Sequence, residues 1–245
     1  MTDSRFEGNL KLYKEDFNKL KNKHVLIIGA GGVGSWCAEF LVRSGIHKLT
    51  LVDLDDICVT NINRQVQALT STVGQFKVET LKKRIQDINP DCEVNEICDF
   101  YTKDTTSEIL NADYDFVIDA FDSAKNKALL AYECADKKIP LILSGAAGGK
   151  KDLTLIDLKN FKRVENDKLI KTIRRDLKKY HPDFFKKDYF LPCVFSPEST
   201  VIDEKYKGGG INCRGALGSS GMMTASFGLR MANYVLEYFI NDSTH

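Results

Sequence analysis

A glycine-rich stretch near the start of the chain limits its fold more than any other feature. Four glycines, Gly29, Gly31, Gly32 and Gly34, lie in the sequence GAGGVG, directly after the apolar run HVLII. This GxGxxG spacing, with a strand predicted before it and a helix after it, permits a tight turn and lets backbone N–H groups approach phosphate. Asp53 ends the next apolar run, where its carboxylate can bind ribose hydroxyls. The pattern predicts a nucleotide site on a Rossmann-like sheet.

The first 150 residues alternate short apolar runs with amphipathic stretches. Strands are predicted at 24–30, 48–53, 93–98, 115–120 and 140–146, and helices at 33–44, 75–89 and 123–137. Nearly continuous apolar strands that alternate with helices are typical of an α/β fold, with a mostly parallel sheet covered on both faces. We therefore expect residues 1–150 to form a nucleotide-binding, Rossmann-like core.

Residues 151–245 change in character, and we expect them to form a smaller C-terminal extension of the same domain. The pattern predicts a strand at 153–158, an amphipathic helix at 165–180, and a packed terminal helix at 222–240. The glycine-rich segment 208–221 predicts a mobile or tightly turning loop. The terminal helix carries Arg230, Asn233 and Glu237, which are costly in lipid, so we do not expect it to cross a membrane.

Composition and charge indicate a cytoplasmic protein with a polyanionic partner. We expect no secretory signal, because the start MTDSRFEGNL has no basic region followed by an apolar stretch. The seven cysteines include no CxxC pair, which argues against a disulfide framework or a four-cysteine zinc site. Between Lys159 and Lys187 the balance of charged residues is +7, while the whole chain carries only +1. A strongly basic surface on an otherwise acidic body suggests a partner such as RNA, although a solvated helix face is the simpler explanation.

Two cations and a carboxylate favour ATP over a dinucleotide. Asn61, Arg64 and Gln65 lie in TNINRQ, shortly after Asp53, and Lys77 follows on the next predicted helix. Obligate cations beside a bound nucleotide suit a triphosphate better than a nicotinamide ring. At the end of the run DFVIDA lie Asp119 and, three residues further, Asp122, where a carboxylate can hold Mg²⁺ together with phosphate oxygens. These residues predict an ATP–magnesium site.

The motifs GAGGVGS, LVDLDDICVTNINRQ, GQFKVE and VIDAFDS together resemble the ubiquitin-activating-like (ThiF/MoeB/HesA) adenylyltransferases, over about residues 5–150. By this resemblance, Asp53 holds the ribose, Asn61, Arg64 and Lys77 hold the triphosphate, and Asp122 binds Mg²⁺ near the α-phosphate. The resemblance also implies a homodimer, with an arginine from the partner subunit completing the site. Arg5 is the candidate, although the segment RFEGNLKLYK lacks the usual second arginine.

Further segments resemble one subfamily, the tRNA threonylcarbamoyladenosine dehydratases, along nearly the full length. They are RFEG, CVTNINRQ, SGAAGG, CVFSPE, GGINCRG and MMTASFG. The resemblance implies that ATP adenylates the threonyl carboxylate of the modified tRNA nucleoside beside the anticodon, after which the ring closes. The basic helix would then hold tRNA through Lys168, Lys171, Arg175 and Lys178. It further implies Na⁺ or K⁺ as a cofactor, and Cys213 as a thiol for a sulfur-acceptor protein of a cysteine desulfurase system.

Other functions remain open at the level of sequence. The main alternative is an adenylyltransferase that activates the C-terminus of a ubiquitin-like sulfur carrier, with Cys213 as the thioester or persulfide site. The paired CxxC zinc ligands common in such enzymes are absent from this chain. A catalytically silent nucleotide-binding regulator and a dinucleotide oxidoreductase are the remaining alternatives, and the intact Asn61, Arg64, Lys77 and Asp122 argue against silence.

Overall fold

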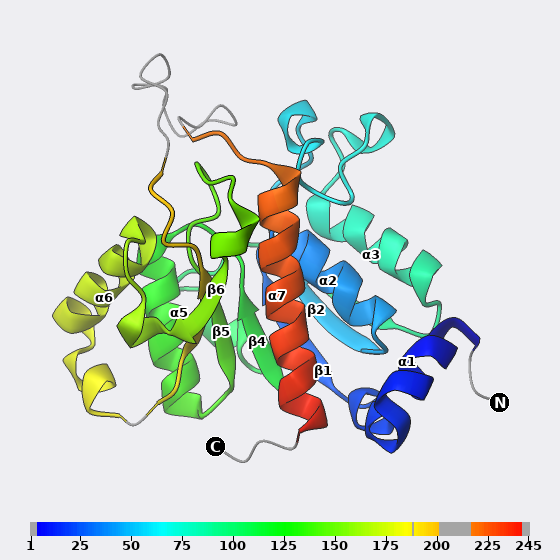
Figure 1. Cartoon of the computed structure of the whole chain (residues 1–245), viewed down its shortest axis with the longest axis horizontal. Helices are drawn as coiled ribbons and strands as arrows, with labels where there is room; N and C mark the ends of the chain where they lie inside the picture. The colour runs from blue at the N-terminus through cyan, green and yellow to red at the C-terminus, as the bar shows by residue number, and fades with distance from the viewer. Residues whose placement is uncertain (1–3, 188, 201–216, 242–245) are drawn as a thin grey trace.

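The computed structural model describes residues 4–187, 189–200 and 217–241. Within these residues, seven strands form one sheet in the order β3-β2-β1-β4-β5-β7-β6 (Figure 1). The strands are β1 (His24–Ile28), β2 (Lys48–Val52), β3 (Glu93–Ile97), β4 (Phe116–Asp119), β5 (Leu141–Ser144), β6 (Asp157–Asn160) and β7 (Pro192–Phe195). Neighbouring strands pair parallel, except that β6 lies antiparallel to β7. The predicted mostly parallel α/β sheet is confirmed.

The helices lie where the amphipathic stretches predicted them. The described α-helices are α1 (Glu7–Tyr13), α2 (Gly34–Arg43), α3 (Lys77–Ile88), α4 (Thr106–Ile109), α5 (Ala124–Lys137), α6 (Lys168–Tyr180) and α7 (Gly221–Ile240). Five of these correspond to predicted helices, while the short helices α1 and α4 were not predicted. Ile170, Ile173 and Leu177 form the buried face of α6, whereas Tyr180, the last residue of the helix, is 58% exposed.

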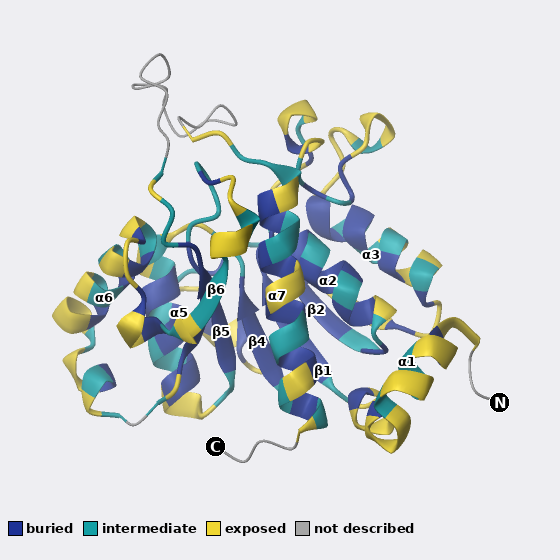
Figure 2. Cartoon of the chain, in the orientation of Figure 1, coloured by how far each residue is buried: buried dark blue, intermediate teal, exposed yellow. Residues whose placement is uncertain are grey.

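Two apolar cores lie on opposite faces of the sheet, because successive strand residues point to opposite sides. Val25 and Ile27 of β1 join the core under α2, α3 and α7, whereas Leu26 and Ile28 join the core under α5 and α6. Figure 1 shows α7 beside α2, and α6 beside α5. Figure 2 shows the central strands β1, β4 and β5 buried and the outer faces of α6 and α1 exposed. The sheet is therefore covered on both faces, as its nearly continuous apolar strands predicted.

The strand predicted at 153–158 was placed too early in the chain. Residues 153–155 form a turn of 3₁₀-helix, η5 (Leu153–Leu155), and the strand β6 begins only at Asp157. The cause is local, since the Asp152 carboxylate accepts hydrogen bonds from the backbone N–H and the hydroxyl of Thr154, at 2.9 and 2.6 Å. These bonds bend the backbone out of the extended conformation. The buried strand β7, which the sequence did not predict, lies between β5 and β6.

Among the described helices, none is long and apolar enough to cross a membrane. The terminal helix α7 instead packs against α2 and against the sheet. The Phe116 ring of β4 meets the rings of Tyr234, Tyr238 and Phe239 at steep angles, with centroids 5.1–6.3 Å apart. These contacts bury one side of α7, in agreement with the predicted packed terminal helix.

Candidate active site

The glycine loop lies at the carboxyl ends of β1 and β4, and two of its glycines have no room for a side chain. Gly29 has a φ of +97°, and a Cβ there would lie 2.7 Å from the carbonyl oxygen of Ala120. A Cβ on Gly34 would lie 1.8 Å from the Gly29 carbonyl oxygen. A Cβ on Gly31 would lie 4.0 Å from Gln65 Nε2, and a Cβ on Gly32 would lie against the Thr224 side chain. The tight turn opens α2, so the backbone N–H groups at its start face the end of the sheet.

Asp53 holds the glycine loop from the end of β2. Its Oδ2 accepts a hydrogen bond from the Ala30 N–H at 2.7 Å, and its Oδ1 accepts one from the Asp55 N–H at 3.0 Å. Burial raises the pKa of Asp53, and the nearby Lys77 ammonium opposes that rise. Lys77 Nζ lies 2.6 Å from Asp55 and 3.9 Å from Asp53. The ribose and phosphate candidates therefore lie side by side.

The TNINRQ segment packs onto the glycine loop and α2. The Asn61 Oδ1 atom accepts a hydrogen bond from the Cys58 N–H at 3.0 Å, which fixes the turn. The backbone carbonyl of Arg64 accepts a hydrogen bond from Trp36 Nε1 at 3.0 Å. Gln65 is buried, and its Oε1 has no hydrogen-bond partner in the described structure. The structure thus brings Asn61, Arg64 and Gln65 to the same end of the sheet as Asp53.

The two carboxylates after β4 have different environments. Asp119 is fully buried and lies 2.6 Å from Lys127 Nζ, which also donates to the Ser144 carbonyl at 2.9 Å. Burial raises the pKa of Asp119 to about 6, with Lys127 acting in the opposite direction. Asp122 is exposed in the turn between β4 and α5, two residues after Ala120, which contacts Gly29. Asp119 is therefore committed to an internal ion pair, whereas Asp122 faces solvent beside the glycine loop.

Two buried lysines were missed by sequence reasoning. Lys127 lies on the buried face of α5 with Ala131 and Cys134, at helical spacing, and a lysine on an apolar stripe was the available signal. Lys150 follows the loop after β5, where its Nζ lies 3.4 Å from Asp167 and donates to the Ser196 carbonyl at 2.6 Å. No local sequence pattern predicts the Lys150–Asp167 pair, because the two residues lie far apart in the chain.

Helix α6 begins at the carboxyl edge of the sheet and runs away from it. Asp167 caps the helix by accepting from the Ile170 N–H at 3.0 Å, and its other oxygen accepts from the Ala146 N–H at 2.9 Å, just beyond β5. The four predicted RNA-binding cations are all exposed: Lys168, Lys171, Arg175 and Lys178. Lys168 lies next to the capped end, and Lys178 lies about 15 Å further along the axis. They form one exposed row that starts beside the active-site edge.

In its own chain, Arg5 lies at the amino ends of the strands, opposite to the end that carries the glycine loop. It belongs to η1 (Ser4–Phe6), whose Phe6 ring contacts the His47 ring at a centroid distance of 5.8 Å. His47 immediately precedes β2, whereas Asp53 immediately follows it. The length of that strand, about 16 Å at 3.3 Å per residue, therefore separates Arg5 from the end of the sheet that carries the glycine loop. Arg5 does not join the site of its own chain.

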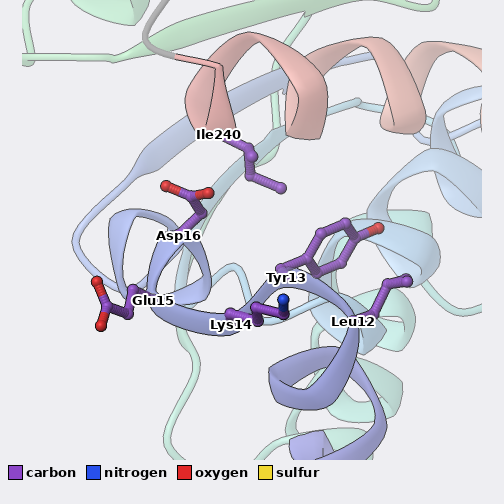
Figure 3. Close-up of a pocket in the computed structure, with 6 residues that line it drawn as sticks. All are labelled: Leu12, Tyr13, Lys14, Glu15, Asp16 and Ile240. Atoms are coloured by element: carbon purple, nitrogen blue, oxygen red, sulfur yellow. The ribbon is translucent and has the colours of Figure 1, made fainter.

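Cys213 lies outside the described residues, so its predicted role stays a prediction. Among the residues that the structure describes, no group of three or more His, Cys, Asp and Glu side chains could hold a metal ion. A surface pocket at the far edge, between residues 12–16 and Ile240 at the end of α7, contains none of the predicted site residues (Figure 3).

Comparison with known proteins decides the family. The family model described as ThiF family matches residues 7–244. The chain belongs to the ThiF family. This membership confirms the resemblance that the glycine loop, the TNINRQ segment and the VIDAFDS motif indicated, and it agrees with the observed Rossmann-like sheet.

Within the ThiF family, the similarity extends over the full chain for one group of relatives. The tRNA threonylcarbamoyladenosine dehydratase of Haemophilus influenzae is 40% identical over 243 residues, which cover 96% of this chain and 93% of that protein. The crystal structure of Escherichia coli tRNA N6-threonylcarbamoyladenosine dehydratase, TcdA, in complex with ATP matches with a TM-score of 0.88 and 38% identity, covering 97% of this chain and 94% of the other.

A second group of ThiF-family relatives matches over less of the chain. The molybdopterin-synthase adenylyltransferase of Escherichia coli is 35% identical over 146 residues, covering 58% of this chain and 58% of that protein. The shared part is the size of the nucleotide-binding core alone. The comparison therefore favours the dehydratase group over the sulfur-carrier adenylyltransferases that the sequence left as the main alternative.

Proposed function

We propose that this ThiF-family protein is an ATP-dependent tRNA threonylcarbamoyladenosine dehydratase, active in the cytoplasm. The observation that carries the proposal is similarity to such dehydratases over 96% of the chain, which includes α6, β7 and α7 as well as the core. The ATP-bound structure of a close relative supports the choice of nucleotide. The buried loop at the carboxyl edge, with Asp53, Arg64 and Lys77 around it, supplies the chemistry that such a reaction needs.

The proposed reaction has two steps that balance without a protein nucleophile. A carboxylate oxygen of the threonyl group attacks the α-phosphorus of ATP, and pyrophosphate leaves. A nucleophilic atom of the ureido linkage then attacks the acyl carbon, AMP leaves with the former carboxylate oxygen, and the attacking group loses its proton to solvent. The net change is the loss of one water from the nucleoside, coupled to cleavage of ATP to AMP and pyrophosphate. Ring closure is intramolecular, so positioning supplies much of the rate.

Each site residue has a proposed part in that reaction. Asp53 would bind the ribose hydroxyls while its backbone contacts keep the glycine loop in place. Asn61, Arg64 and Lys77 would bind the phosphates, with Gly29, Gly31, Gly32, Gly34 and Gln65 shaping the loop around them. Charged donors that are fixed before the reaction stabilise the negative charge that develops on the phosphates. The ion pair of Lys77 with Asp55 positions the lysine in advance.

We propose that Asp122 holds Mg²⁺. Its exposed carboxylate beside the glycine loop fits this ion, which binds through one or two carboxylates together with phosphate oxygens. When bound, the ion would neutralise charge on the phosphates. Replacing Asp122 by Asn should lower turnover by about 10²-fold or more while leaving the melting temperature unchanged. Unchanged turnover in Asp122→Asn would remove this residue from the proposed site.

A homodimer is proposed because it alone would bring Arg5 to a nucleotide site. Large apolar side chains are exposed on α7 and on the adjoining loop, among them Met222 at 69% and Val59 at 67%. An isologous contact would bury them. Mixing an Arg5→Ala variant with a Lys77→Ala variant should restore roughly a quarter of wild-type activity, because half of the dimers are mixed and each has one intact site. No recovery would exclude Arg5 from a shared site.

Two further parts of the proposal rest on resemblance alone. The Cys213 thiol would serve a sulfur-acceptor protein of a cysteine desulfurase system, and a monovalent cation, Na⁺ or K⁺, would assist the enzyme. Neither has a described residue that identifies its site. Both stay predictions of the sequence.

Mass spectrometry of tRNA nucleosides tests the proposed function directly. The protein is incubated with ATP, Mg²⁺ and threonylcarbamoylated tRNA. The tRNA is then digested to nucleosides, and their masses are measured. We expect a product lighter by one water, formed only with ATP. Calorimetric titration should show binding of ATP and no measurable binding of NAD. Tighter binding of NAD than of ATP, or no mass change in the nucleoside, would contradict the proposal.

A further inference from the structure

A short segment, residues 217–221, crosses the carboxyl edge of the sheet and joins its two halves. On one side, the Gly149 N–H of the loop after β5 donates to the Gly218 carbonyl at 2.7 Å. On the other side, Asn63 Nδ2 donates to the Ser219 carbonyl at 2.7 Å. The Ser220 hydroxyl then caps α7 at the Met222 N–H. Figure 1 shows this segment at the top of the molecule, leading into α7. We name residues 217–221 the bridging segment.

The bridging segment is fitted closely against the residues next to Arg64. A Cβ on Gly221 would lie 2.5 Å from the Asn63 carbonyl oxygen, so only glycine permits this approach. One turn further along α7, the Thr224 hydroxyl donates to the Arg64 carbonyl at 3.3 Å. The start of α7 therefore sets the position of the backbone that carries Arg64.

The Asn63 side chain connects the Arg64 guanidinium with the bridging segment. Arg64 Nη1 donates to Asn63 Oδ1 at 3.0 Å and to the Thr60 carbonyl at 2.6 Å, while Asn63 Nδ2 faces the Ser219 carbonyl. An amide has one accepting end and one donating end. The guanidinium selects the accepting end, so the donating end must point at the bridging segment. A triphosphate that draws Arg64 away would remove this constraint on the amide.

We propose that Asn63 is a positioning residue that couples Arg64, through the bridging segment, to the loop after β5. Binding of ATP at Arg64 then changes the contact between Asn63 and Ser219, and with it the hydrogen bond from Gly149 to Gly218. The inference rests on the proposed binding of ATP by Arg64. Its consequence is that the half of the edge next to α6, where the tRNA would lie, responds to nucleotide.

Asn63→Asp separates the two contacts of the side chain. The carboxylate keeps an acceptor for Arg64, but it sets an oxygen against the Ser219 carbonyl and removes the donor there. Gly221→Ala disturbs the same contact from the other side, through the clash with the Asn63 carbonyl. The matched control is Asn9→Asp, because Asn9 Nδ2 also donates to a backbone carbonyl, that of Arg43 at 3.1 Å, and lies in α1 at the opposite edge.

Hydrogen exchange measured by mass spectrometry reads the coupling without tRNA. In wild type and in Asn9→Asp, saturating ATP should change the exchange rate of the peptide containing Gly149 by about fivefold or more. In Asn63→Asp and in Gly221→Ala, ATP should still bind, more weakly because both changes lie beside Arg64, but at saturating ATP the change at Gly149 should be lost. Turnover with tRNA should fall about tenfold in both variants, and the double variant should fall no further, because both act on one contact.

The outcomes separate the inference from the function on which it rests. If wild type fails to bind ATP, the proposed function is wrong, and this inference falls with it. If wild type binds ATP but exchange at Gly149 does not change, or if Asn63→Asp shows the same change as wild type, the coupling is refuted while the proposed function stands. If Asn63→Asp and Asn9→Asp lose the same thermal stability and show the same ATP-dependent change in exchange at Gly149, Asn63 has only a structural role and the coupling is refuted.

Discussion

Replacing Lys127 by Met should destabilise the protein in a way that depends on pH. The Lys127 side chain is 0% exposed, and its ammonium lies 2.6 Å from Asp119 Oδ1 and 2.9 Å from the Ser144 carbonyl. The Asp119 Oδ2 atom has no hydrogen-bond partner in the described structure. Methionine fills a similar volume, but it leaves the buried carboxylate without its ammonium partner. Breaking such a buried pair costs about 3–5 kcal/mol at neutral pH.

The pH dependence follows from the pKa of Asp119, which burial raises from 3.8 to about 6 in the wild type. Between those two values the folded state binds more protons than the unfolded state, so wild-type stability falls as pH rises and then levels off above pH 6. Lys127 lowers this pKa, so its removal raises the pKa further. In Lys127→Met the fall in stability therefore continues above pH 6. The gap to wild type widens there by about 1.4 kcal/mol per pH unit.

Urea denaturation at pH 5, 6, 7 and 8 measures this gap, with fluorescence of the single tryptophan, Trp36, as the signal. We expect a nearly constant gap between pH 5 and 6, and a gap at pH 8 that exceeds the gap at pH 6 by up to about 3 kcal/mol. The double variant Asp119→Asn/Lys127→Met carries neither charge, so its gap to wild type should not widen above pH 6. A gap for Lys127→Met that stays constant from pH 6 to 8 would refute the reasoning.

Three further predictions concern the site and the partner. Gly34→Ala should weaken ATP binding by about tenfold or more, because its Cβ would lie 1.8 Å from the Gly29 carbonyl; calorimetry checks this, and unchanged affinity would contradict the tight turn. The double variant Lys171→Glu/Arg175→Glu should weaken tRNA binding strongly and flatten its salt dependence with ATP binding unchanged. Filter binding compares this variant with Lys21→Glu/Lys83→Glu, which makes the same charge change at exposed positions elsewhere. An equal loss of tRNA affinity in the two double variants would exclude α6 from the RNA-binding surface. Cys213→Ala should keep most dehydration in a purified system, since ring closure needs no thiol, and complete loss with normal ATP binding would favour a covalent carrier mechanism.

The local pattern of residues was enough to predict the core of the fold. The strands β1, β2, β4 and β5 are short apolar runs, and α2, α3 and α5 have helical spacing, so these elements could be assigned from their own residues. The glycine loop was also predictable, because the steric demands of Gly29 and Gly34 leave a fixed spacing in the sequence. Asp53, Arg64 and Lys77 could be placed at the same end of the sheet as that loop, since each lies at a set distance after an element that the pattern identified.

Only the tertiary structure decided which distant residues meet. The strand β7 is four residues long, and its short apolar run does not show by itself that it lies between β5 and β6. The Lys150–Asp167 pair and the contact of Asn63 with Ser219, 156 residues away, join segments that share no local pattern. Arg5 was a candidate by resemblance, and only the fold placed it at the far edge of its own sheet. Periodicity and turn chemistry act within a few residues, whereas burial and ion pairing act between whatever surfaces the chain brings together. Sequence therefore determined the elements and the nucleotide loop, and packing determined the network around them.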